Sequence, residues 1–251
     1  VVLKVGYPHD ENLTGIIALQ AYDGRGAVRV IDAHLPSQAL LMERLTPGHN
    51  FRSTAQGATP GLARSRVPLS LFNDLPLHQW QRSSELIPSF QDWLDGAFSA
   101  YRSGDSQDAG HLKCIALAER LYADLVSRYA DDTLLHGDLH HENILMDEHR
   151  GWLAIDPKGV TGPPVMECGR FIQNFIEDEA GPLLDASVAQ IQEVFETRFD
   201  NFAALMGFPR SDIIAATFID LVVSNTWTLN DGVHAPEGLL LIDIVFRLAD
   251  R

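Results

Sequence analysis

This chain of 251 residues has few cysteines, few basic side chains and no long apolar run. Its two cysteines, Cys114 and Cys168, are too few for a disulfide framework, and their spacing matches no metal motif. Lysine and arginine number 19 against 34 acidic residues, which gives a formal net charge of −15. Nucleic acid or an anionic membrane is therefore not expected as the main partner, because binding either requires a basic surface. The charge is compatible with a cationic substrate.

Other absences restrict the class of protein further. No apolar run approaches the roughly 18 residues that a membrane-spanning helix needs, and no charged-then-apolar leader is visible. With its few cysteines, the chain is expected to be cytoplasmic. The sequence also lacks the G-x-S-x-G motif of serine hydrolases and the glycine spacing of the common phosphate-binding loops.

The apolar pattern predicts a strand-rich start, a central hairpin and a mainly helical remainder. Strands are predicted over 1–5, 27–32, 38–45, 134–136, 143–146 and 152–155. Apolar residues at three- and four-residue spacing predict helices over 13–22, 112–129, 168–177, 186–206, 211–229 and 237–249. Residues 49–84 are rich in Ser, Pro, Gly and Gln and are expected to be connecting structure with short helices. This order predicts an α+β protein with two lobes.

The strongest chemical signal is the segment HGDLHHEN, followed by two short apolar strands and the sequence IDPK. It places Asp138, Asn143 and Asp156 in the kinase pattern H-x-D-x-x-x-x-N with a later aspartate. A hairpin between the two strands would bring Asn143 and Asp156 to adjacent strand ends. Phosphoryl transfer from ATP needs a carboxylate that orients the attacking hydroxyl and hard oxygen ligands for Mg²⁺. The segment therefore predicts a phosphotransferase.

These motifs resemble those of the aminoglycoside and hydroxyurea phosphotransferases, and the streptomycin branch in particular, within the protein-kinase-like superfamily. HGDLHHENIL and LAIDPKG are similar to that family's loops, and LKV, DGRGAVRVID and ALLMERLTPG follow in the family's order. The resemblance covers nearly the whole chain. It implies a small β-rich N-lobe over residues 1–48, with a hinge near 43–47. Residues 49–251 would form a larger, mainly helical C-lobe that carries the catalytic and metal-binding loops.

The resemblance also implies roles for the three motif residues. Asp138 would be the catalytic base or the residue that orients the acceptor hydroxyl. Asn143 and Asp156 would bind Mg²⁺, and ATP would be the phosphate donor. The acceptor would be a small molecule, either an aminoglycoside-like aminocyclitol or a hydroxyurea-like compound, and a cationic one would suit the acidic composition.

A second set of roles concerns the nucleotide. Lys4 would pair with the ATP phosphates. The Glu43 carbonyl and the Leu45 N–H would bind adenine at the hinge, with Met42 at the gate of the pocket. The resemblance thus assigns Lys4, Met42, Glu43 and Leu45 to one nucleotide site.

Two features depart from the family pattern. The glycine-rich hairpin that covers the phosphates lies upstream of the lysine strand in that family, and the N-lobe predicted from this sequence lacks it. The helix glutamate that should pair with Lys4 aligns with Gly15, and Glu11 is the nearby acid considered in its place. The sequence leaves open whether Glu11 pairs with Lys4.

Two other functions remain open from the sequence. The missing hairpin and Gly15 would suit a pseudokinase that binds nucleotide without catalysis, although the intact aspartates and asparagine favour an enzyme. His136 and His140 are four residues apart among further polar side chains, which could suggest a zinc hydrolase. That spacing binds zinc on a helix, whereas Gly137 and the following strand predict a loop.

The acceptor is expected to be a small molecule because the segment after the metal-binding aspartate is short. Only Pro157 to Met166 separate Asp156 from Glu167, and their glycines and prolines predict a tight turn without a peptide platform. The C-terminal helices carry acids that could attract a guanidinium or ammonium group, or that merely solvate helix surfaces. They are Asp178, Glu179, Asp220 and Asp231.

Overall fold

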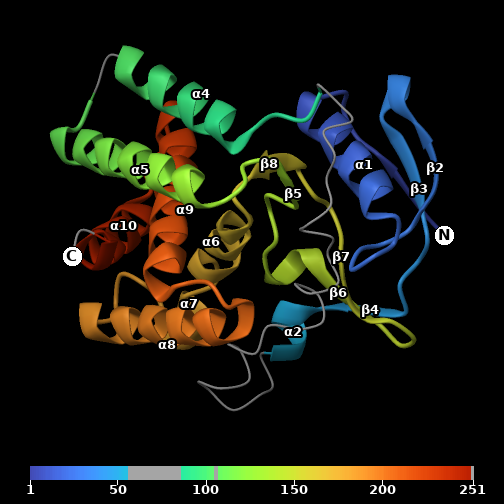
Figure 1. The fold of residues 1–251 in the computed structure, drawn as a ribbon. Helices are drawn as coiled ribbons and strands as arrows, with labels where there is room; N and C mark the ends of the chain where they lie inside the picture. Colours follow the sequence, from blue (N-terminus) through green and yellow to red (C-terminus); the bar gives the residue numbers. More distant parts are fainter. Residues whose placement is uncertain (56–85, 105–106, 250–251) are drawn as a thin grey trace. The chain divides into compact units, whose positions relative to one another are not determined.

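The structure is a computed structural model that describes residues 1–55, 86–104 and 107–249 (Figure 1). It divides into two compact units: unit 1 comprises Val1–Pro88 and Asp132–Pro164, and unit 2 comprises Ser89–Asp131 and Val165–Arg251. Unit 1 contains both the N-terminal strands and the segment around Asp138. The predicted lobe boundary at residue 48, with its hinge near 43–47, stays a prediction.

Three antiparallel strands open unit 1 in the spatial order β1-β3-β2, and they are β1 (Val2–Val5), β2 (Val30–His34) and β3 (Ala39–Met42). The short 3₁₀ helix η1 (Leu35–Ser37) connects β2 to β3. Leu40 and Met42 of the central strand are buried, whereas β1 is exposed along its length. Lys4 lies opposite Leu40 in this pairing. Each strand overlaps its predicted range and is shorter than predicted, and β2 ends two residues beyond its predicted end at residue 32.

Helix α1 (Asp10–Tyr22) follows the first strand. Its start is capped by His9, whose ring nitrogen accepts a hydrogen bond from the Glu11 N–H at 3.3 Å. It ends at Asp23, which adopts a left-handed conformation with φ of 50°. The helix buries Ile16, Leu19 and Tyr22.

The predicted central hairpin is present: β6 (Ile144–Asp147) pairs antiparallel with β7 (Gly151–Ala154), and β4 (Pro47–Asn50) pairs with β6. The one-turn helix η2 (His141–Asn143) precedes β6, and α2 (Phe51–Ala55) follows β4. A bridge between Ala27 and Ala154 joins this hairpin to the residues before β2. Connecting structure was predicted over 49–84, and residues 56–84 of that stretch lie outside the described residues.

A further strand lies in the stretch that was predicted to be a tight turn. β5 (Thr133–Leu135) pairs antiparallel with β8 (Val160–Gly162), and the 3₁₀ helix η3 (Pro164–Met166) follows. Val160 and Thr161 are buried. Glycine and proline density suggested a turn, but the edge of β5 satisfies the backbone groups of this stretch as a ladder.

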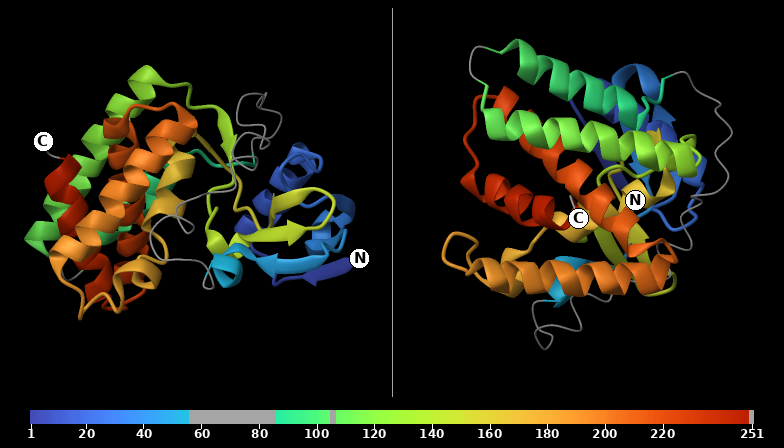
Figure 2. Two further views of the ribbon diagram at one scale, coloured as in Figure 1. Left: turned by 90° about the horizontal axis from the view of Figure 1, so that it is seen from below. Right: turned by 60° about the vertical axis from the view of Figure 1, so that its left-hand side comes forward.

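Unit 2 is built around one central helix, α9 (Arg210–Asn230), which packs against α4, α5, α6, α8 and α10 (Figures 1 and 2). The surrounding helices are α4 (Phe90–Ser103), α5 (Ala109–Arg128), α6 (Glu167–Gln173), α7 (Glu177–Ala180), α8 (Val188–Met206) and α10 (Pro236–Ala249). By length and hydropathy α9 could cross a membrane, but 78% of its apolar window is buried inside the structure. It is therefore the core helix of unit 2.

The observed helices correct the sequence prediction at two points. Helix α4 was not predicted, although Ser89 and Asp92 form a capping box at its start and Leu94, Phe98 and Tyr101 lie on its buried face. The helix predicted over 168–177 ends at Gln173 and is followed by the separate short helix α7. The α+β class itself is confirmed.

Candidate active site

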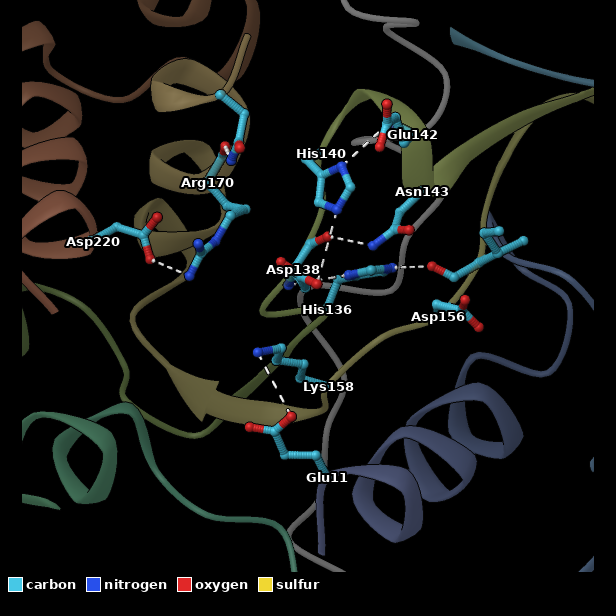
Figure 3. Close-up of polar contacts among 12 residues, drawn as sticks. Glu11, His136, Asp138, His140, Glu142, Asn143, Asp156, Lys158, Arg170 and Asp220 are labelled. Atoms are coloured by element: carbon cyan, nitrogen blue, oxygen red, sulfur yellow. Dashed lines mark hydrogen bonds and ion pairs between the residues drawn. The ribbon is translucent and has the colours of Figure 1, made fainter. Parts of the chain in front are cut away.

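The loop between β5 and β6 is organised around His136, which is completely buried. Its Nε2 lies 2.8 Å from the Ile155 carbonyl oxygen, and its Nδ1 accepts a hydrogen bond from the Asp138 N–H at 3.2 Å (Figure 3). Burial lowers the pKa of His136 to about 4, so the ring is neutral near pH 7 and its Nε2–H donates to the carbonyl. Both ring nitrogens are therefore engaged in holding the loop, as the sequence suggested for this histidine. Gly137, at φ of 75°, makes the turn.

Asp138 follows that turn, with 25% of its side chain exposed. Its carbonyl oxygen accepts hydrogen bonds from the His140 N–H at 3.0 Å and from the Asn143 Nδ2 at 2.9 Å. His140 Nε2 lies 3.9 Å from the Asp138 Oδ2, and the other ring nitrogen accepts from the Glu142 N–H at 3.3 Å. The loop thus fixes the backbone of Asp138 and leaves its carboxylate accessible to solvent.

Asn143 and Asp156 occupy adjacent strand ends, as the sequence predicted. The Ile155 N–H donates to the Asn143 carbonyl oxygen at 2.9 Å, which places the next residue, Asp156, beside Asn143. The Asn143 side chain donates through Nδ2 to the Asp138 carbonyl, so its Oδ1 is the remaining acceptor. Asp156 has a left-handed backbone with φ of 55° at the end of the strand.

The donor chemistry of this pair fits Mg²⁺ better than zinc. One carboxylate and one amide oxygen are hard ligands, and Mg²⁺ bound to a nucleotide takes its remaining ligands from phosphates and water. In the part of the chain that the structure describes, no group of three or more His, Cys, Asp or Glu side chains could hold a metal ion. Both nitrogens of His136 are also occupied. The zinc-hydrolase alternative is therefore not supported.

Lys4 forms an ion pair with Asp156, with 2.9 Å between the Lys4 Nζ and the Asp156 Oδ1. Glu11 pairs instead with Lys158, at 3.7 Å, as Figure 3 shows. The sequence left open whether Glu11 pairs with Lys4, and in this geometry it does not. In the structure the partner of Lys4 is the predicted metal ligand, and Glu11 has a different partner.

A cavity of about 570 Å³ lies elsewhere in the molecule, but the one of about 550 Å³ in unit 1 is lined by five predicted site residues. They are Lys4, Met42, Glu43, Leu45 and Asp156. Arg44 and apolar side chains such as Val28, Leu145 and Ile155 also line it. Asp138 and Asn143 do not line this cavity, and they are connected to it through the hydrogen bonds of their loop to Ile155. A cavity that combines apolar side chains with cationic groups and carboxylates suits a nucleotide.

The side chain of Glu43 is held by groups that sequence reasoning did not identify. Its carboxylate binds Arg150 and accepts a hydrogen bond from the Arg29 N–H at 2.6 Å. Arg150 also donates to the Gly24 carbonyl oxygen at 3.1 Å. Neither the Glu43 carbonyl oxygen nor the Leu45 N–H has a hydrogen-bond partner among the described residues. These are the two backbone groups that the sequence resemblance assigns to adenine.

Two of the four acids considered for the acceptor are already paired within unit 2. Asp220 is buried and accepts hydrogen bonds from Arg170, at 3.2 Å, and from Gln173. Glu179 lies 2.6 Å from Arg198, and both side chains are buried. They are therefore structural partners, and they do not solvate a helix surface as the alternative supposed.

Comparison with known proteins identifies relatives of this chain. A sequence model of the family described as aminoglycoside/hydroxyurea antibiotic resistance kinase matches residues 1–232. Streptomycin 6-kinase of Streptomyces griseus is 28% identical over 245 residues, which cover 93% of this chain and 72% of that protein. Hydroxyurea phosphotransferase of Kitasatospora aureofaciens is 30% identical over 243 residues, which cover 94% of this chain and 64% of that protein.

Solved structures show the same fold. A thermostable mutant of aminoglycoside phosphotransferase APH(4)-Ia, crystallised with AMP-PNP and hygromycin B, matches with a TM-score of 0.65 and 14% identity, over 99% of this chain and 87% of that one. Choline kinase LicA from Streptococcus pneumoniae matches with a TM-score of 0.63 and 12% identity, over 99% of this chain and 85% of that one. The predicted protein-kinase-like fold is confirmed.

Proposed function

Because the chain belongs to the aminoglycoside/hydroxyurea antibiotic resistance kinase family, we propose that it transfers the γ-phosphate of ATP to a hydroxyl group of a small molecule. The observation that carries the proposal is a hydrogen-bonded loop. The Asn143 side chain holds the backbone of Asp138, and the Asn143 carbonyl binds the Ile155 N–H, next to Asp156. Asp156 also lines the cavity that contains Lys4. Phosphoryl transfer depends mainly on such positioning and on electrostatic stabilisation.

Asp138 is the residue assigned to the acceptor. Its accessible carboxylate accepts a hydrogen bond from the attacking hydroxyl. It takes up the hydroxyl proton as the acceptor oxygen bonds to the γ-phosphorus and the bond from that phosphorus to the bridging oxygen breaks, which releases ADP. His136, which is neutral and fully engaged, holds the loop and is not the base. The contribution of a positioned general base is about 10²–10⁴-fold in rate.

Lys4, Met42, Glu43 and Leu45 are assigned to the nucleotide. The Glu43 carbonyl and the Leu45 N–H, which have no hydrogen-bond partner among the residues that the structure describes, offer an acceptor and a donor to the adenine edge. Lys4 provides a positive charge for the phosphates. Asn143 and Asp156 would hold Mg²⁺, which neutralises phosphate charge in the transition state.

The acceptor is proposed to be an aminoglycoside-like or hydroxyurea-like compound, since those are the substrates named for the relatives. A cationic acceptor is supported by the net charge of −15 and, among the four acids considered, by Asp231. Asp231 is exposed at the end of α9. A cytoplasmic location, where ATP is available, is part of the same proposal.

The test is a screen for ATP consumption with streptomycin, other aminocyclitols, hydroxyurea, neutral sugars and a generic protein substrate. Asp138→Asn is the matched control, because it keeps the size of the side chain and removes the carboxylate. We expect turnover with at least one small acceptor and a loss of about 10²-fold or more in kcat for the variant. Nucleotide binding without turnover on any acceptor would favour the pseudokinase. Efficient phosphorylation of the protein substrate would contradict a small-molecule acceptor.

A further inference from the structure

Lys4 pairs with Asp156 for a steric reason that lies in helix α1. A Cβ atom added at Gly15 would lie 2.3 Å from the Pro157 carbonyl oxygen, which is far inside van der Waals contact with a backbone atom. Any side chain at position 15 would therefore displace either the helix or the segment after Asp156. The helix position that aligns with the family's acid cannot carry one in this packing.

Two further contacts hold α1 against the same segment. The Thr14 hydroxyl donates to the Lys158 carbonyl oxygen at 2.5 Å. Gly159 has φ of 69°, and a Cβ atom there would lie 2.6 Å from the Thr14 carbonyl oxygen. Helix backbone and loop backbone are thus in direct contact at Gly15 and Gly159. This contact fixes the segment that begins at Asp156.

The electrostatic consequence falls on Lys4. Its ammonium group is not paired with Glu11 of α1, which pairs with Lys158. It pairs with Asp156 at 2.9 Å, and the two side chains are 43% and 42% exposed. The same carboxylate is the predicted ligand of the divalent cation. The Asp156 carboxylate therefore has two cationic groups that could pair with it, the Lys4 ammonium group and the divalent cation.

We propose that Lys4 and a divalent cation compete for Asp156, and that nucleotide resolves the competition by giving Lys4 its phosphates as a new partner. In this arrangement Lys4 opposes binding of metal alone and favours binding of metal with nucleotide. The proposal rests on the phosphotransferase function and adds an order to it, with metal and nucleotide binding as one coupled event.

The test compares Lys4→Met with Lys158→Met by titration of Mn²⁺, followed through the spectroscopic signal of the unbound ion. Both variants remove one positive charge near Asp156, but among the ion pairs of the described residues it is Lys4 that pairs with Asp156, whereas Lys158 pairs with Glu11. For a half-exposed ion pair we expect the affinity of Lys4→Met for Mn²⁺ alone to rise by about two- to fivefold. Lys158→Met is expected to change it less.

With AMP-PNP present, the effect of Lys4→Met on the affinity for Mn²⁺ should reverse. Lys4→Met is then expected to bind Mn²⁺ and nucleotide about tenfold or more weakly than the wild type, because the phosphates lose a cation at close range. A lysine with a merely structural role would weaken both measurements together. Opposite changes in the two titrations support the competition.

The proposal is overturned if Lys4→Met leaves the affinity for Mn²⁺ alone unchanged or lowers it, or if Lys158→Met raises it equally. Absence of Mn²⁺ binding in both the wild type and Lys4→Met overturns it as well. Those results are distinct from failure of the proposed function, because a wild-type protein that still phosphorylates an acceptor would keep the function without the competition. A wild type that binds no Mn²⁺ with AMP-PNP contradicts the function itself.

Discussion

His136 illustrates how one residue links the stability of the fold to the site. It is buried without charge, and burial outweighs the opposing influence of the Ile155 carbonyl and the Asp138 carboxylate, so its pKa falls from 6.5 to about 4. Between those two values the unfolded chain binds a proton that the folded protein does not. Stability is therefore complete above about pH 6.5 and is lost as the pH falls toward 4.

We expect this histidine to contribute a loss of about 3 kcal/mol in unfolding free energy over that pH range, at about 1.4 kcal/mol per pKa unit. Urea unfolding of the wild type and of His136→Asn at several values between pH 7 and pH 4 measures it. Other groups also titrate in this range, so the informative quantity is the difference between the two pH profiles. Parallel profiles would contradict a neutral buried histidine.

The arginine–acid pairs of unit 2 show a second residue-scale device. Arg198 is buried and pairs with Glu179, and it also donates to the carbonyl oxygens of Ile172 and Asn174, each at 2.7 Å. Burial lowers the pKa of Arg198, while Glu179 opposes that change. These carbonyls belong to the end of α6 and the loop after it. The pair therefore terminates α6 and fixes the segment that a continuous helix was predicted to occupy.

At the scale of elements, α1 is positioned by the absence of side chains at its contact with the loop after β7. Gly15→Ala is expected to lower the unfolding free energy by about 1–3 kcal/mol, because overpacking against the Pro157 backbone outweighs the gain in helix propensity. Gly96 of α4 is the matched control, since a Cβ atom there would meet nothing within 4 Å. Gly96→Ala should stabilise the protein by up to about 1 kcal/mol.

Thermal unfolding of the two variants beside the wild type checks this prediction. The expected result is opposite in sign, with a lower melting temperature for Gly15→Ala and an unchanged or higher one for Gly96→Ala. If Gly15→Ala were as stable as the control, α1 would not be in close contact with the loop. The Lys4–Asp156 pair would then lose its steric explanation.

At the scale of the whole molecule, the excess of acidic residues should affect the encounter with the acceptor. A net charge of −15 attracts cations over distances that salt screens, with a Debye length of about 10 Å at 0.1 M. For streptomycin we expect kcat/KM to fall as NaCl rises from about 0.02 to 0.3 M, by several-fold. A neutral acceptor measured in the same series is the control.

If the two acceptors showed the same dependence on salt, the effect would lie in ATP binding and not in attraction of the acceptor. If kcat/KM for the cationic acceptor were independent of salt, the preference for a cation would be wrong. The small-molecule kinase function would remain in either case. Asp220 and Glu179 are not expected to contribute, because each already neutralises a buried or half-buried arginine.

The sequence by itself determined the parts of this protein that depend on local pattern. Asp138, Asn143 and Asp156 are separated by fixed, short stretches of chain, so the hairpin between β6 and β7 brings the two predicted metal ligands, Asn143 and Asp156, together once it forms. The long helices followed from three- and four-residue periodicity, with α4 overlooked despite its capping box. The family resemblance supplied the roles that spacing alone could not assign.

Only the tertiary structure decided which partners those residues have. Lys4 and Asp156 are 152 positions apart, and Glu43 and Arg150 are 107 apart, so no local pattern relates them. The pairing of β8 with β5 and the burial of Asp220 likewise depend on segments that meet only after folding. The sequence showed that Gly15 stands where the family has an acid. Its close contact with Pro157 could be known only from the positions of both backbones in the structure. Periodicity fixes which residues are buried, whereas packing between distant segments fixes what each charge touches.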